Sequence, residues 1–288
     1  MTIKIYEMVT ERIMKMLEAG VIPWRKPWIN NGAVNWKTQK PYRGINTMLL
    51  DPGEYATIKQ INEAGGRVKK GEKAHIVVFW KWVNAKDEDG NVTDEKIPLL
   101  RYYRVFEINS QCEGMKSKRK SVAIDHDPIA EAEKIVEGFP DMPPLRFAPG
   151  RAFYRPSEDF ISVPEINDFP IVGEYYCTLF HEMIHSTGHP NRLNRPGVAN
   201  FDTFGSEQYS KEELIAEMGA AMLCGVAGID NSTIQNSASY IASWLRKLKD
   251  DPKLVIQAAG QAQKAADLII GIKFNAEQAG EETEGEAA

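Results

Sequence analysis

The fold of the second half of this chain is decided by the stretch Phe180-His181-Glu182-Met183-Ile184-His185-Ser186-Thr187-Gly188-His189. In a helix, His181 and His185 lie one turn apart on one face, so their imidazoles can share a divalent cation. Glu182 lies on the flank of that face, where it can take a proton from water at the metal without being a ligand itself. This His-Glu-x-x-His pattern is typical of metal-dependent peptidases, and it predicts an active-site helix.

The opposite side of the same helix is apolar. The residues that recur there at helical spacing are Tyr176, Leu179, Phe180, Met183 and Thr187. Such a face buries a helix against a core. An alternative is that the two histidines only cap the helix or hydrogen-bond within it. Three of the five histidines of the chain fall between residues 181 and 189, and histidines placed only by packing need not cluster.

A catalytic zinc ion takes three protein ligands and keeps one position for water, so the two histidines need a partner. His189 has the right angular position if the helix continues. Gly188 before it and Pro190 after it predict instead that the backbone turns there. The third ligand is therefore expected from another helix.

A second helix, predicted at residues 210–221, supplies two acidic candidates. Glu213 and Glu217 lie four residues apart on one face. Small residues would let this helix approach the first one closely: Ala216, Gly219 and Ala220. We predict Glu213 as the third ligand and Glu217 as a carboxylate that orients a ligand histidine. In the alternative, Ser210 and Glu213 form a capping box and Glu217 is the ligand.

The net charge of −5 conceals two halves of opposite sign. Residues 1–124 hold 22 Lys+Arg against 14 Asp+Glu, a net +8, whereas residues 125–288 hold 13 against 26, a net −13. A basic half joined to an acidic half predicts two domains with different partners. We place these domains at 1–124 and 125–274, followed by an acidic tail at 275–288 that is too poor in apolar residues to fold.

No secretory signal or membrane-spanning run is visible, so we expect a cytoplasmic protein with no membrane partner. The three cysteines are odd in number and widely spaced, and they predict neither a disulfide framework nor a cysteine-type zinc site. Cys177 and Cys224 lie in apolar, helical runs and are expected in the core.

Aromatic rings, cations and prolines alternate at residues 21–28, and residues 35–46 continue the mixture. Single-stranded nucleic acid is bound by flat rings that stack on bases and by cations that follow the phosphates. The residues predicted to bind it are Trp24, Arg25, Lys26, Trp28, Trp36, Tyr42, Arg43, Lys69 and Lys70. The alternative is that the tryptophans pack a small core and the lysines are only solvated.

Local patterns predict the remaining elements. Helices are expected at 4–19, 55–64, 129–138 and 252–270, strands at 74–83 and 98–108, and a hairpin from 151–155 and 160–164. The basic run 116–120 has no apolar periodicity and is expected to be a mobile linker. Tyr240 is a candidate for polarising a substrate carbonyl, with a place in the core as the alternative.

On these residues the chain resembles the ArdC family of plasmid antirestriction proteins, over nearly its whole length except the acidic tail. The first half is similar to the family's single-stranded-DNA-binding domain in Pro-Trp-Arg-Lys-Pro-Trp at 23–28, Tyr-Arg-Gly-Ile-Asn at 42–46 and Gly-Gly-Arg-Val-Lys-Lys-Gly-Glu-Lys at 65–73. The second half is similar to its zincin-like metallopeptidase domain in the stretch 180–189, in Arg192-Leu193-Asn194-Arg195 and in Glu-Glu-Leu-Ile-Ala-Glu-Met-Gly-Ala-Ala at 212–221.

The resemblance implies an α+β chain, with a small basic α+β domain that binds single-stranded DNA followed by a mostly helical zincin-like domain with a short β-hairpin or sheet. It implies a protein that coats incoming single-stranded DNA and spares it from host restriction enzymes. It also implies one zinc ion at His181, His185 and an acidic ligand from the 213–217 helix. Two alternatives remain: an active zinc metallopeptidase that its basic domain recruits to a protein substrate near DNA, and a non-catalytic DNA-binding protein stabilised by its metal.

Overall fold

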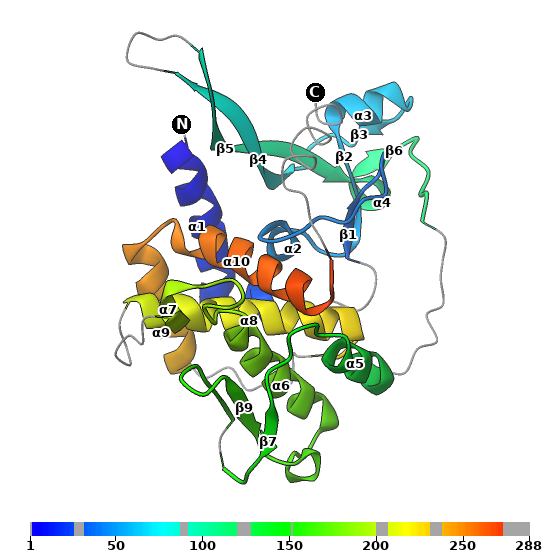
Figure 1. The fold of residues 1–288 in the computed structure, drawn as a ribbon. Helices are drawn as coiled ribbons and strands as arrows, with labels where there is room; N and C mark the ends of the chain where they lie inside the picture. The colour runs from blue at the N-terminus through cyan, green and yellow to red at the C-terminus, as the bar shows by residue number, and fades with distance from the viewer. Residues whose placement is uncertain are drawn as a thin grey trace. The chain divides into compact units, whose positions relative to one another are not determined.

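The computed structural model describes residues 2–25, 32–86, 92–119, 128–150, 152–199, 207–230 and 238–272 (Figure 1). The protein has an α+β fold, as predicted. It divides into two compact units, the first built mainly from residues 31–122 with residues 1–12, the second from residues 13–30 and 123–273. Residues 13–30, assigned to the first domain from the sequence, therefore group with the second. The division falls inside α1 (Thr2–Glu18).

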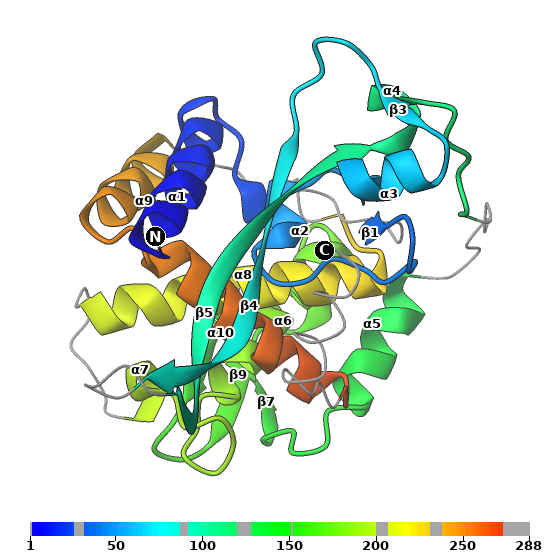
Figure 2. The same ribbon diagram turned by 90° about the horizontal axis from the view of Figure 1, so that it is seen from above.

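A four-stranded sheet organises the first unit. Its strand order is β1 (Ala33–Asn35), β2 (Gly53–Thr57), β5 (Val92–Glu107) and β4 (His75–Lys86). β1 and β2 are parallel and the other neighbours antiparallel. β4 and β5 form a long twisted hairpin (Figure 2) whose register pairs Phe79 with Arg101 and Val77 with Tyr103. Because paired residues share a face of a sheet, these four side chains leave it on the same side.

That face carries an apolar cluster formed by Ala33, Tyr42, Leu50, Tyr55, Val77 and Val105. Phe79 and Tyr103 pack against the cluster and remain partly exposed. At the edge of the sheet, α2 (Asn46–Leu49) contacts β4. The side-chain amide of Asn46 donates to the carbonyl of Val78 at 2.8 Å and accepts from its N–H at 2.7 Å. The backbone of the edge strand is therefore paired at this position.

The helix predicted at 55–64 begins later than expected. Residues 55–57 form the end of β2, and α3 (Ile58–Glu63) starts after Thr57. The Thr57 hydroxyl accepts from the N–H of Gln60, and the Gln60 side chain accepts from the N–H of Thr57, which is a capping box. Beyond α3, β3 (Arg67–Val68) pairs with β6 (Cys112–Glu113), which follows α4 (Ile108–Gln111).

The basic run at 116–120, expected to be a mobile linker, is anchored in its described part. The N–H of Lys118 donates to both carboxylate oxygens of Glu54, at 3.1 and 3.2 Å. The Arg119 guanidinium donates to the carbonyls of Gly32 and Gly53. Glu54 is almost fully buried, and a buried carboxylate needs such donors. The linker prediction was wrong here because burial of Glu54 is a tertiary feature.

The second unit is mostly helical. At its centre, α8 (Glu207–Ala227) packs against both α6 (Val172–Ser186) and α10 (Leu254–Ile269) (Figure 1). The further helical elements are η1 (Pro23–Arg25), α5 (Pro128–Glu137), η2 (Ile166–Asp168), α7 (Pro196–Ala199) and α9 (Ala238–Asp250). Cys177 and Cys224 lie in the core, as predicted, with their Sγ atoms 2.9 Å apart between α6 and α8.

A three-stranded sheet completes the second unit, in the order β7 (Leu145–Phe147), β9 (Phe160–Val163) and β8 (Phe153–Arg155). The predicted hairpin is confirmed by the antiparallel pairing of β8 with β9, whereas the parallel strand β7 was not predicted.

Among the described helices, none combines the length and the apolar character needed to cross a bilayer.

Candidate metal centre

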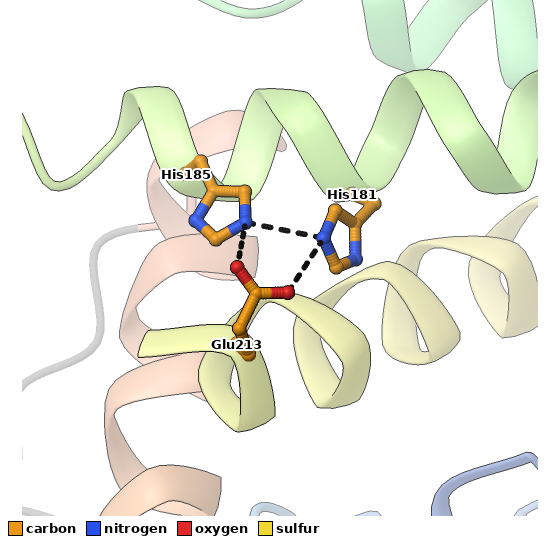
Figure 3. Close-up of side chains that lie close together, drawn as sticks. All are labelled: His181, His185 and Glu213. Atoms are coloured by element: carbon orange, nitrogen blue, oxygen red, sulfur yellow. Dashed lines mark hydrogen bonds and ion pairs between the residues drawn. The ribbon is translucent and has the colours of Figure 1, made fainter. Parts of the chain in front are cut away.

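Three side chains from two helices converge on one point, as Figure 3 shows. His181 and His185 project from the same face of α6, with their Nε2 atoms 3.1 Å apart. From α8, one carboxylate oxygen of Glu213 lies 3.5 Å from Nε2 of His185 and the other lies 3.7 Å from Nε2 of His181. One ligand atom from each residue can be chosen so that all three lie within 4.8 Å of one another.

The close approach of α6 and α8 depends on a glycine. A Cβ atom added to Gly219 would lie 2.6 Å from Cδ1 of Ile184, well inside van der Waals contact. Gly219, one of the small residues predicted to allow close packing, thus faces α6. Because α8 begins at Glu207, Ser210 is inside the helix and cannot be its cap, which removes the capping-box alternative for Glu213.

The far nitrogen of His185 has its own carboxylate partner. Nδ1 of His185 lies 3.2 Å from Oε1 of Glu212. Glu212 in turn accepts two hydrogen bonds from Arg195, at 2.6 and 2.9 Å, and both side chains are buried. A carboxylate on the far nitrogen fixes the tautomer and the ring orientation of a metal-binding histidine.

The carboxylate that contacts the far nitrogen of His185 is thus that of Glu212, whereas the prediction had assigned such a contact to Glu217. Glu217 accepts a hydrogen bond of 3.0 Å from the indole Nε1 of Trp24 in η1. The sequence contained one signal for Glu212, which stands directly before Glu213 in the same helix. That signal was insufficient, because it is Arg195, seventeen residues earlier, that makes burial of the Glu212 carboxylate favourable.

The electrostatics of the site fit a cation. Burial alone would lower the pKa of His185, but its hydrogen bond with Glu212 and the charges of Glu182, Glu212 and Glu213 raise that pKa to about 9. Two imidazole nitrogens and a carboxylate oxygen are all electron-pair donors, and they repel one another unless positive charge lies among them. Nitrogen and carboxylate ligands of this kind suit Zn²⁺.

Glu182, the predicted general base, lies on α6 directly after His181 and is 8% exposed. It is not among the residues whose ligand atoms converge, although its charge contributes to raising the pKa of His185. The arrangement thus leaves Glu182 beside the site and outside the set of candidate ligands.

The end of the metal-site helix is held by two arginines of the Arg192-Leu193-Asn194-Arg195 segment. α6 ends at Ser186, so His189 lies beyond the helix, as predicted. Arg195 donates to the carbonyl of Ile184 and Arg192 to that of Ser186. These carbonyls lie in the last turn, where cations are favoured by the helix dipole. The arginines therefore position the helix that carries both histidines.

A turn between β8 and β9 is tied to the same region. Arg192 donates to Asp159 three times, at 2.9 to 3.0 Å, and Asp159 also accepts from the hydroxyl of Tyr154 at 2.7 Å. Burial raises the pKa of Asp159, but these hydrogen bonds outweigh it and hold the pKa below its ordinary value. The three-stranded sheet is thus connected to the end of α6.

The residues predicted to bind nucleic acid are placed differently from one another. Trp24 is fully buried and packs edge-on against Trp244 at 6.0 Å, so it offers no ring face to a base, and that part of the prediction was wrong. Trp36 is partly exposed, with the Lys118 ammonium 3.9 Å above its ring. Tyr42 belongs to the apolar cluster of the sheet.

The basic residues are also dispersed. Lys70 is exposed, and the ammonium of Lys69 donates to the carbonyl of Ser110 at 2.6 Å. Arg43 is partly buried. Lys26, Trp28 and the side chains of Arg25 and Tyr240 lie outside the described residues, as does the predicted acidic tail.

Two family models match the chain. Residues 3–106 match the N-terminal domain of anti-restriction factor ArdC, and residues 134–261 match a zincin-like metallopeptidase. Similar solved structures include two crystal structures of the antirestriction ArdC protein from plasmid R388. The metal-free structure has a TM-score of 0.73 and 36% identity, covering 93% of this chain and 99% of that one. The Mn(II)-bound structure has a TM-score of 0.72 and 37% identity, covering 92% and 96%.

Curated sequences give a similar result. The uncharacterized protein y4eC of Sinorhizobium fredii is 32% identical over 294 residues, covering 95% of this chain and 94% of that protein. A DNA primase TraC of Escherichia coli is 33% identical over 293 residues. That alignment covers 93% of this chain and only 20% of TraC, and a second TraC is covered to 28%, so the chain spans about a quarter of these longer relatives.

Proposed function

The chain belongs to the ArdC family of antirestriction proteins, and on that basis we propose that it binds single-stranded DNA, protects that DNA from restriction, and holds one zinc ion at His181, His185 and Glu213. The observation that carries the metal assignment is the convergence of these three side chains from α6 and α8. A related structure contains Mn(II), which supports a divalent metal ion in this chain. We propose that this ion is Zn²⁺.

The residues around the ligands support this site. Glu212, held by Arg195, accepts from Nδ1 of His185 and so leaves the lone pair of Nε2 directed at the ligand position. Arg195 balances the charge of Glu212, so that the remaining negative charge near the cation comes from Glu213 and Glu182. A divalent cation bound there would supply Lewis acidity, polarising a carbonyl and acidifying water.

Glu182 is the residue proposed to move a proton. It lies beside the three converging residues, it is not one of them, and its carboxylate is nearly buried. A carboxylate in such a position can accept a proton from an attacking water and pass it to a leaving amine. This arrangement favours a second candidate function, a zinc metallopeptidase that the basic domain recruits to a protein near DNA.

Association with DNA is supported by the net +8 of residues 1–124 and by two relatives that are named DNA primases. Cations in this half, with Arg43, Lys69 and Lys70 among them, would neutralise phosphates. Tyr42 and Trp36 would supply aromatic surface to bases. Binding through phosphates predicts a steep loss of affinity with salt.

The test of this function uses the full chain and two assays. Fluorescence anisotropy with a labelled single strand and with its duplex, over a series of salt concentrations, should show tighter binding to the single strand and a steep salt dependence. A restriction digest then compares wild type with Glu182→Gln. Protection that survives the substitution supports a role for DNA coating, whereas loss of protection with DNA binding retained identifies the peptidase as the working activity.

A further inference from the structure

The four-stranded sheet of the first unit carries a pocket on one face. Among the residues that line it are Val77 and Val105, the aromatic side chains of Tyr42, Phe79 and Tyr103, and Lys40. All of these residues come from β4, β5 and the segment after β1, which lie within one compact unit. None of the described residues that line the pocket is acidic.

The three rings are held in a row by packing. The centroids of Tyr42 and Phe79 are 6.1 Å apart, and those of Phe79 and Tyr103 are 5.9 Å apart. Tyr42 and both valines belong to the buried cluster, on which Phe79 and Tyr103 rest while part of each ring stays exposed. Rings fixed in this way lose little further side-chain entropy when a flat ligand stacks on them.

Basic side chains lie on the same face of the sheet as the three rings. Arg101 is the register partner of Phe79, so its exposed side chain leaves the sheet beside that ring. Lys81 lies two residues after Phe79 on the same strand and therefore points to the same side. Because Lys40 also lines the pocket, positive charge lies close to the three rings. This charge complements a polyanion better than a neutral or basic partner.

We propose that the pocket of Tyr42, Phe79 and Tyr103 receives one unstacked nucleobase of single-stranded DNA, while Lys40 and Arg101 hold the phosphates on either side of it. The inference rests on the proposed DNA binding and adds the place where a base is contacted. A base is a flat ring with an apolar face, and stacking on aromatic side chains accepts every base.

The polar side chains of Asn35, Thr38 and Thr57 in the pocket do not favour readout of base identity, because each is engaged within the protein. Oγ1 of Thr38 accepts from the backbone N–H of Lys40, and Oγ1 of Thr57 accepts from that of Gln60, both at 3.3 Å. Oδ1 of Asn35 already accepts from the backbone N–H groups of Lys37 and Thr38, at 2.9 and 3.1 Å. Its hydrogen-bonding capacity is thus largely used within the turn after β1. We expect stacking with little preference among the four bases.

The experiment uses the full chain, with Tyr103→Leu and Phe79→Leu as test variants and Tyr102→Leu as the matched control. Tyr102 is the neighbour of Tyr103 on β5, is 41% exposed and faces the opposite side of the sheet. Leucine retains apolar volume for the core, and thermal melting verifies that each variant folds. The probes are a labelled dT20, a 20-mer of the same backbone whose sites are all abasic, and U20.

The expected result has two parts. Tyr103→Leu and Phe79→Leu each weaken dT20 binding roughly five- to hundredfold, the range for loss of one stacked base, while Tyr102→Leu stays within about twofold. Binding to the abasic chain is equal in wild type and all three variants, because it depends on phosphates alone. Lys40→Gln and Arg101→Gln each reduce the slope of log affinity against log salt by about 0.7. Equal affinity for U20 extends the ligand to RNA.

Different failures have different meanings. If wild type binds dT20 but Tyr102→Leu and Tyr103→Leu lose the same affinity, or neither loses any, the pocket is overturned and DNA binding stands. If wild type binds the abasic chain as tightly as dT20, no base is contacted and the pocket is likewise overturned. If wild type does not bind dT20, the proposed function fails and the pocket with it.

Discussion

Oε1 of Glu212 lies 3.2 Å from Nδ1 of His185, on the side of the imidazole opposite the nitrogen that faces His181 and Glu213. Neighbouring glutamates of α8 thus contact the two nitrogens of one histidine. Glu213 is positioned to bind a cation, and Glu212 orients the imidazole ring of His185.

Substitution of Glu212 by Gln should therefore affect both metal and fold. Gln keeps a hydrogen-bonding oxygen for His185 but leaves the buried guanidinium of Arg195 without its carboxylate. We expect metal affinity to fall about 10- to 100-fold and the metal-free protein to lose about 3 kcal/mol or more of unfolding free energy. Chelator competition and urea unfolding measure the two effects. An unchanged metal-free stability would contradict the proposed ion pair.

Glu213→Gln should give the complementary result. We expect it to abolish stoichiometric metal in the purified protein while leaving metal-free stability nearly unchanged, because Glu213 is partly exposed and is surrounded by other electron donors. Glu217→Gln is the matched control one turn later, and it should retain the metal. Elemental analysis of the purified variants measures the bound metal. If Glu217→Gln loses the metal and Glu213→Gln keeps it, Glu217 is the third ligand in place of Glu213.

Gly219→Ala should destabilise the second unit by about 1–3 kcal/mol, because the added methyl group meets the Ile184 side chain at 2.6 Å. Gly260→Ala in α10 is the control. No atom lies within 4 Å of its added methyl group, so the better helix propensity should stabilise the protein by about 0.5–1 kcal/mol. Ile184→Val, which removes Cδ1, should partly rescue Gly219→Ala. Equal shifts in the two glycine variants would argue against close helix packing.

Acid should remove the contribution of the Asp159–Arg192 pair. The folded pKa of Asp159 is held below its ordinary value, so its stabilising effect is present above the unfolded pKa of about 3.9 and is lost as pH falls through the folded pKa. Asp159→Asn suits the left-handed backbone at this residue, where φ is +47°. It should cost about 1–3 kcal/mol at pH 7. In urea unfolding the difference from wild type should shrink towards pH 3; a constant difference would rule out the charge as its source.

Local spacing was sufficient to predict the metal-site helix and its partner. The His181–His185 interval and the Glu213–Glu217 interval each describe a helix face, and the glycine at 219 indicates close packing. Features that depend on distant residues were missed. The buried carboxylate of Glu212 is paired with Arg195, and the buried indole of Trp24 donates to Glu217 in α8, and neither partner is close in sequence.

Short elements were also difficult to predict. Strand β7 has three residues, and its parallel pairing with β9 is made by residues sixteen positions away. The prediction that a helix begins at residue 55 was wrong, because the three residues before Ile58 are aromatic, apolar or β-branched and complete strand β2. Thr57 and Gln60 held the relevant capping signal, which marked the true start of α3.

The side chain of Asn46 on Val78 has a consequence for how this protein behaves at high concentration. β4 borders the described sheet, and a long bare border is a template on which another extended chain can add itself. The amide of Asn46, which already occupies both main-chain groups of Val78, interrupts that template at the fourth residue of β4. A second copy that added itself along this border would therefore have to break both hydrogen bonds of Asn46 to pair at Val78.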